Sequence, residues 1–169
     1  MRLAGVLSES VVDGPGVRFV VFAQGCPHRC PGCHNPETWD PDGGGERSVR
    51  EVVRLLKKKC KQKPGYLRGV TLSGGEPFCQ AADFARLAGE ARKLGLDVAV
   101  YTGFTYEQLL EKRDPEIDAL LSEADILVDG PFVLALRDLS LKFKGSANQR
   151  LIDLNRSREM NAVVLLDGE

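Results

Sequence analysis

The sequence lacks the features that membrane proteins and secreted proteins require. No apolar run is long enough to cross a bilayer, and the N-terminal stretch has no long apolar core of the signal-peptide kind. The net charge of the 169 residues is −1, so no overall charge favours binding to nucleic acid or to an acidic membrane. No internal repeat or low-complexity linker is present. We therefore expect a single domain over residues 1–169 that is cytoplasmic and binds neither membrane nor nucleic acid.

Histidine is scarce, and cysteine is unevenly distributed. The chain has two histidines and five cysteines, yet both histidines and three of the cysteines fall in GCPHRCPGCHN, residues 25–35. In a reducing compartment, clustered cysteines more often bind metal or perform redox chemistry than form structural disulfides. The remaining two, Cys60 and Cys79, lie outside this stretch, and nothing in the sequence requires them to act.

The clustered cysteines, Cys26, Cys30 and Cys33, have the spacing C-x3-C-x2-C. Thiolates suit zinc, copper(I) and iron–sulfur clusters. A structural zinc site needs four protein ligands, and the fourth could only be His34, His28, or the distant Cys60 or Cys79. His34 is poorly placed because it directly follows Cys33. Three thiolates without an obvious fourth ligand fit a 4Fe–4S cluster that has one open iron. The spacing favours such a cluster and leaves a zinc-binding module and redox-active thiols as alternatives.

Strand and helix patterns alternate along the chain. Short apolar, β-branched runs predict strands at 17–23, 69–73, 96–101 and 126–130, and one more at 161–166. Helical spacing and capping residues predict helices between these strands. The expected helices cover about 49–61 and 84–94, with shorter ones that begin after Thr105 and Asp114.

This alternation indicates an α/β fold with a mostly parallel sheet. A complete eightfold barrel usually needs more than about 200 residues, so we expect a partial, laterally open (β/α) barrel. The loops that follow parallel strands emerge at one edge of a sheet. Three unusual loops each follow a strand: the cysteine loop, GGE at 74–76 and TGF at 102–104. We expect them to converge on one site.

The order of these motifs resembles the radical S-adenosylmethionine superfamily, whose radical domain has the fold just described. The resemblance implies that Cys26, Cys30 and Cys33 bind a 4Fe–4S cluster whose open iron chelates S-adenosylmethionine. It also implies that the triplet after the second strand contacts the amino group of the methionine part of S-adenosylmethionine. That triplet consists of Gly74, Gly75 and Glu76.

Further residues are expected near the cofactor. The backbone of Gly32, Cys33 and His34 would line the adenine pocket, since it is tied to the cluster. Thr102 and Gly103 would contact the ribose or methionine part of S-adenosylmethionine. An equal alternative is that Thr102 and Gly103 only form the start of a capped helix and do not contact the cofactor.

A narrower resemblance is to the activating proteins of anaerobic ribonucleoside-triphosphate reductase. Many members of the superfamily carry an aromatic residue before the third cysteine, whereas this sequence has Gly32 within CPGC. The other segments that agree with this narrower family are DGPGVRFVVFAQGC (13–26), NPETWD (35–40), TLSGGEPF (71–78), YTGFTYEQL (101–109), VDGPF (128–132) and KGSANQRLID (144–153).

This resemblance implies an oxidoreductase that activates a partner enzyme. A 5'-deoxyadenosyl radical, released by reductive cleavage of S-adenosylmethionine, would take a hydrogen atom from a backbone glycine of the anaerobic (class III) reductase catalytic subunit and leave a glycyl radical. Flavodoxin or ferredoxin would supply the electron. The alternatives are an activase of another glycyl-radical enzyme and a small-molecule radical enzyme such as 7-carboxy-7-deazaguanine synthase.

Overall fold

A computed structural model describes residues 1–166. Its centre is one seven-stranded sheet with the order β3-β1-β2-β4-β5-β6-β7. The strands are β1 (Arg2–Ser10), β2 (Arg18–Ala23), β3 (Gly45–Glu46), β4 (Gly69–Gly74), β5 (Asp97–Tyr101), β6 (Ile126–Asp129) and β7 (Arg150–Asp153). The four strands β2, β4, β5 and β6 are parallel, and antiparallel strands flank them on both sides. The sheet has two free ends, so the predicted open α/β architecture is confirmed.

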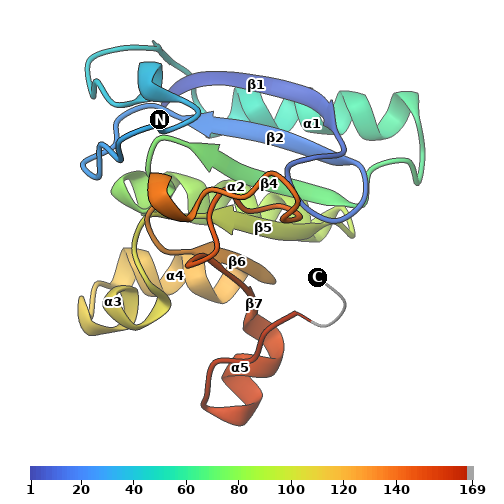
Figure 1. Cartoon of the computed structure of the whole chain (residues 1–169). Coiled ribbons are helices and arrows are strands. Elements are labelled where there is room, and N and C mark those ends of the chain that lie inside the picture. The colour runs from blue at the N-terminus through green and yellow to red at the C-terminus, as the bar shows by residue number, and fades with distance from the viewer. Residues whose placement is uncertain (167–169) are drawn as a thin grey trace.

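Three helices cover one face of this sheet (Figure 1). Helix α2 lies between the other two and packs against both, and its apolar side chains meet the central strands. The covering helices are α1 (Val49–Gln62), α2 (Ala81–Lys93) and α4 (Pro115–Glu123). The shorter elements are α3 (Tyr106–Glu111), α5 (Leu154–Met160) and the 3-10 turns η1 (Pro36–Thr38), η2 (Pro77–Gln80) and η3 (Leu134–Leu136). None of the helices within residues 1–166 is long and apolar enough to cross a membrane.

Helices α1, α3 and α4 begin where the sequence predicts them, whereas α2 begins at Ala81, before the start expected near residue 84. Ser48 and Glu51 form a reciprocal capping box at the start of α1, and Thr105 and Gln108 form another at the start of α3. Each box satisfies backbone donors that a helix start would otherwise leave unpaired. These caps set the points at which the chain leaves the sheet edge and turns back along the helical face.

Three strands, β1, β3 and β7, were missed from the sequence, and one predicted strand is wrong. Strand β1 is mostly half-buried or exposed, and β7 is only four residues long, so neither has the continuous apolar run of a central strand. The stretch predicted as a strand at 161–166 contributes one isolated bridge, between Leu165 and Ile152. Asn161 ends helix α5 in the left-handed conformation, with φ of 50°, and turns the chain away from strand geometry.

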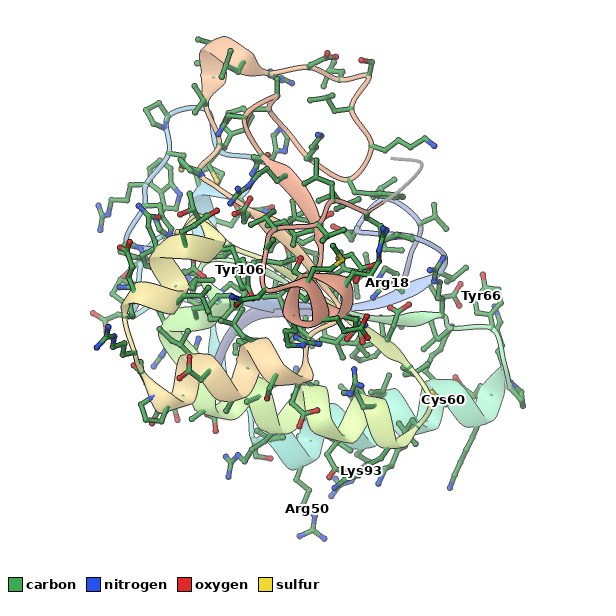
Figure 2. All side chains as sticks on the ribbon, turned by 90° about the horizontal axis from the view of Figure 1, so that it is seen from below. Arg18, Arg50, Cys60, Tyr66, Lys93 and Tyr106 are labelled. Carbon is green, nitrogen blue, oxygen red and sulfur yellow. The ribbon has the colours of Figure 1, made fainter. Side chains whose placement is uncertain are left out.

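One arginine lies within the core. Arg18, at the start of β2, is fully buried, and Figure 2 shows it inside the molecule, whereas Arg50 projects from the helical layer. Its guanidinium donates to Thr71 Oγ1 at 2.6 Å and to Asp97 Oδ1 at 2.5 Å. It also donates to the carbonyl oxygens of residues 15 and 70, each at 2.9 Å. These bonds tie the loop before β2 to the neighbouring parallel strands.

The face of the sheet opposite the helices is crossed by the segment 130–149, which we call the strap (orange in Figure 1). The strap begins after β6 and returns to β7. Its side chains fasten it to itself: Asn148 donates to the Pro131 carbonyl at 2.8 Å, and Ser146 accepts from the Val133 amide at 3.1 Å. The strap therefore forms a wall above the edge where the parallel strands end.

Candidate functional site

The loops that follow the parallel strands surround one cavity of about 570 Å³. The cysteine loop follows β2, Gly75 follows β4, Thr102 and Gly103 follow β5, and Gly130 follows β6. The predicted convergence of the three unusual loops is therefore observed. A cavity of this volume is typical of small-molecule and cofactor sites.

Most of the residues predicted to bind the cluster or the cofactor line this cavity. They are Cys26, Cys30, Cys33, His34, Gly74, Gly75, Thr102 and Gly103. Two of the predicted residues are not part of the lining: Gly32 is exposed, and the Glu76 side chain is buried. The binding role of every one of these residues remains a prediction.

The cysteine loop is a tight coil whose two ends are fastened together. The Gly25 amide donates to the Thr38 carbonyl at 2.8 Å, and the Cys26 amide donates to the Trp39 carbonyl at 3.1 Å. Arg29 has φ of 46°, in the left-handed region that non-glycine residues rarely adopt. Left-handed backbone at the glycines 25 and 32 adds two further sharp turns. The coil returns on itself and directs three thiols to one cavity.

The surroundings of the thiols fit thiolate ligands. Burial raises the pKa of the Cys26 thiol, while the backbone amides of His28 and Arg29 oppose that rise by favouring the thiolate. The Asn35 amide donates to Cys33 Sγ at 3.4 Å. Hydrogen bonds to sulfur are one means by which proteins tune iron–sulfur clusters.

Within residues 1–166, no three His, Cys, Asp or Glu side chains converge on a position for a single ion. In a 4Fe–4S cluster each thiolate binds a different iron, so its ligands surround a group of atoms rather than one point. The three cysteines all line the same cavity, as ligands of such a cluster would.

The Glu76 side chain is fully buried and joins the loops to one another. Its Oε1 accepts from the Phe78 amide at 3.1 Å, and both oxygens accept from Thr102 Oγ1 at 3.0 Å. Its Oε2 also accepts from the Gly103 amide at 3.0 Å and lies 2.7 Å from His28 Nε2. The carboxylate is thus engaged within the protein, and the two glycines of the GGE triplet are the members that face the cavity.

The GGE loop packs directly on the start of the cysteine loop. The Gly75 amide donates to the Ala23 carbonyl at 2.8 Å, and the Glu76 amide donates to the Gly25 carbonyl at 2.8 Å. A Cβ atom at Gly75 would overlap the Gly25 carbonyl oxygen. Glycine is therefore required at this position by close approach of two backbones.

Gly75→Ala is expected to lower the free energy of unfolding by about 2 kcal/mol, because the new methyl group must push two hydrogen-bonded backbones apart. The amount of iron that Gly75→Ala retains after anaerobic reconstitution should also be lower than in the wild-type protein. Urea denaturation and iron analysis measure the two effects. Gly45→Ala is the matched control, since a Cβ there meets open space, and it should change stability by less than about 1 kcal/mol. Equal effects of the two substitutions would contradict the close-approach explanation.

Part of the cavity wall was missed in the sequence. The strap contributes Phe132, residues 141–145 and Gln149 to the lining. Gln149 holds this wall together, because its Oε1 accepts from the Gly145 amide at 2.8 Å and its Nε2 donates to the Gly130 carbonyl at 3.1 Å. Gly32 packs against the strap, since a Cβ there would lie 2.8 Å from Leu134 Cδ1. The likeness of 144–153 to a known signature pointed to this segment without indicating that it lines the site.

Arg150, at the start of β7, fixes the other end of the strap. Its guanidinium donates to Glu107 Oε2 at 2.7 Å and also binds the buried Asp129 carboxylate. These bonds raise the pKa of Arg150 and lower the pKa of Glu107. The arginine therefore links α3, β6 and β7 and is not a free surface charge.

Comparisons with known proteins identify the family of the chain. A family described as a 4Fe-4S single cluster domain matches residues 12–152. The chain is 35% identical over 144 residues to the anaerobic ribonucleoside-triphosphate reductase-activating protein of Vibrio cholerae, covering 82% of this chain and 89% of that protein. It is 42% identical over 120 residues to the pyruvate formate-lyase-activating enzyme of Clostridium pasteurianum, covering 67% of this chain and 49% of that enzyme.

Among solved structures, QueE from Escherichia coli aligns with a TM-score of 0.44 and 20% identity, over 62% of this chain and 52% of that one. The assignment rests instead on the sequence relatives and on the matched cluster domain. The chain belongs to the family of anaerobic ribonucleoside-triphosphate reductase-activating proteins, within the activating enzymes of glycyl-radical enzymes.

Proposed function

We propose that this chain activates an anaerobic ribonucleoside-triphosphate reductase by generating a glycyl radical on its catalytic subunit. The observation that carries the proposal is one cavity lined by three thiols in C-x3-C-x2-C spacing and by the glycines of GGE. The family relationship supplies the class of partner, a glycyl-radical enzyme. The anaerobic reductase is the partner that the relatives covering most of the chain name.

Cys26, Cys30 and Cys33 would hold a 4Fe–4S cluster, and the wall formed by the loops after β4 and β5 would hold S-adenosylmethionine. When bound, these groups supply an electron and a 5'-deoxyadenosyl radical that removes a hydrogen atom from the target glycine. Backbone carbonyls near Gly74 and Gly75, which line the cavity, would accept from the methionine amino group. Thr102 and Gly103 border the same cavity.

The backbone of Gly32, Cys33 and His34 is proposed to contact the cofactor. Cys33 and His34 line the cavity, and Gly32 lets the coil approach the strap closely. We assign the adenine side of S-adenosylmethionine to this part of the wall. The strap then limits access of water from the opposite side, which protects a reactive radical from side reactions.

The remaining parts of the proposal concern the cellular setting. A flavodoxin or ferredoxin supplies the electron, and residues 1–169 act as a single radical S-adenosylmethionine domain in the cytoplasm. The net charge of −1 gives no general attraction for nucleic acid or membrane.

Electron paramagnetic resonance of the complete activation reaction tests this function. The anaerobically reconstituted protein is mixed with dithionite, S-adenosylmethionine and the anaerobic reductase of the same organism. We expect a glycine-centred doublet and one 5'-deoxyadenosine per radical formed. A cluster signal with cofactor cleavage but no doublet would overturn the choice of partner.

A second partner is tested in the same experiment because of the similarity to the activating enzyme of pyruvate formate-lyase. A pyruvate formate-lyase from the same organism replaces the reductase in a parallel reaction. A doublet only in that reaction would identify the chain as a formate-lyase activase. A doublet only with the reductase would establish the proposed function.

A further inference from the structure

His28 is a cysteine-loop side chain that reaches both of the other loops. It lies between two of the proposed cluster ligands, Cys26 and Cys30. Its Nε2 is 2.7 Å from Glu76 Oε2 in the loop after β4. That oxygen also accepts from the Gly103 amide in the loop after β5. A single carboxylate oxygen therefore joins all three loops, and His28 is the cysteine loop's side-chain contribution to that junction.

The His28 ring is held in one orientation. Its ring centroid lies 4.5 Å from that of Phe104, with an angle of 75° between the ring planes, which is an edge-to-face arrangement. A Cβ at Gly103 would overlap the His28 ring, so the backbone after β5 approaches the ring as closely as glycine permits. Because a carboxylate only accepts hydrogen bonds, Nε2 carries the proton and donates to Glu76. The bond is charge-assisted and lies beside a fully buried group, where such bonds are strongest.

This junction does not belong to the hydrophobic core. His28 is 17% exposed and borders the cavity. The Glu76 carboxylate keeps its donors Phe78, Thr102 and Gly103 when the imidazole is removed. The global fold should therefore tolerate the loss of the imidazole N–H, while the distance between the cysteine loop and the other loops should not.

We propose that His28 is a positioning residue that, through Glu76, fixes the three thiols relative to the part of the cavity where S-adenosylmethionine binds. The proposal deepens the proposed function and rests on it, because it takes this cavity as the cofactor site. A cluster and its co-substrate react only when they are held within about 0.5 Å of the productive geometry. A displacement of about 1 Å can reduce a rate by about 100-fold. Joining the two walls of the cavity by a short charge-assisted bond is a direct way to keep that geometry.

Two substitutions at one position separate positioning from a purely structural role. His28→Phe keeps an aromatic ring beside Phe104 but removes the donor, whereas His28→Gln keeps an N–H that can reach the carboxylate. Both are purified as full-length chains and reconstituted anaerobically with iron and sulfide. Iron content, thermal unfolding midpoint, the dissociation constant of S-adenosylmethionine, and the change it causes in the spectrum of the reduced cluster are measured.

We expect His28→Phe to retain the wild-type iron content and to lower the unfolding midpoint by only a few degrees, because the Glu76 carboxylate keeps its other donors. Its S-adenosylmethionine binding should weaken about tenfold or more, with a smaller spectral change on binding. His28→Gln should recover most of the S-adenosylmethionine affinity and most of the spectral change on binding. On a Glu76→Gln background, His28→Phe should add little, because the two changes break the same contact.

Wild-type cofactor affinity together with a wild-type spectral change in His28→Phe would overturn the proposal. Loss of iron in that variant would also overturn it, because His28 would then act in cluster assembly. Failure of the proposed partner reaction is a separate result: a wild-type protein that binds S-adenosylmethionine but forms no glycyl radical refutes the partner, while the His28 comparison still decides the positioning role. A wild-type protein that binds no S-adenosylmethionine refutes both.

Discussion

Single alanine substitutions at Cys26, Cys30 and Cys33 are expected to reduce glycyl-radical formation by at least about 100-fold, whereas Cys60→Ala and Cys79→Ala retain it. Each of the three is proposed to bind a separate iron, and loss of a ligand costs more than the 10–100-fold typical of groups that only support a ligand. Iron and acid-labile sulfide per chain should fall in the same three variants. Chemical analysis and radical quantitation measure these effects.

The two control cysteines are chosen from different surroundings. Cys60 lies in α1 and packs against the hydrophobic core, on the helical side of the sheet (Figure 2). Cys79 lies in η2, is exposed and does not line the cavity. If Cys79→Ala lost the cluster, the ligand set would have to be revised to four cysteines.

Arg18→Met is expected to lower the free energy of unfolding by about 3–5 kcal/mol, the range for removing one partner of a buried ion pair. The substitution removes every donor that Arg18 gives to Thr71, Asp97 and two backbone carbonyls. The thioether cannot replace those donors, so buried acceptors lose their hydrogen bonds. Urea denaturation of the iron-free protein measures the change.

Arg68→Met is a matched control for Arg18→Met because both arginines bind the same carboxylate. Arg68 Nε lies 3.1 Å from Asp97 Oδ2, but its side chain is 57% exposed. Exposed ion pairs contribute at most about 1 kcal/mol, so the loss should be small. Comparable losses in the two variants would show that the buried hydrogen bonds of Arg18 are not the cause.

The four parallel strands were predictable, and the antiparallel strands on either side of them were not. Strand β2 has a continuous apolar run from Phe19 to Ala23 that is almost entirely buried, which is the strongest strand signal in a sequence. Strand β1 mixes Gly5 and polar residues with apolar ones, because it lies beside the short edge strand β3. The strand predicted at 161–166 has the right composition, yet Asn161 turns the chain there. Composition alone does not indicate whether a neighbouring strand has a free side available for pairing.

The proposed ligands were predictable from spacing, whereas the contacts that organise them were not. The spacing of the cysteines is visible within eight residues, and the loop containing them follows a clear strand. The bond between His28 and Glu76 joins residues 48 positions apart, and the bond between Glu76 and Thr102 joins residues 26 positions apart. Such bonds exist only after the strands take their order in the sheet. The sequence therefore indicated GGE as a binding loop but not the role of its carboxylate.

The hydrophobic core is built without the three proposed iron ligands. None of them belongs to either hydrophobic cluster within residues 1–166, and backbone bonds from Gly25 to Thr38 and from Cys26 to Trp39 close the loop at its base. Zinc fingers differ, because metal binding supplies their folding free energy. In this protein, oxygen that destroys the cluster should leave a folded chain behind. Inactivation by air should then be reversible, because the cluster can be rebuilt from iron and sulfide in the same folded chains without new protein synthesis.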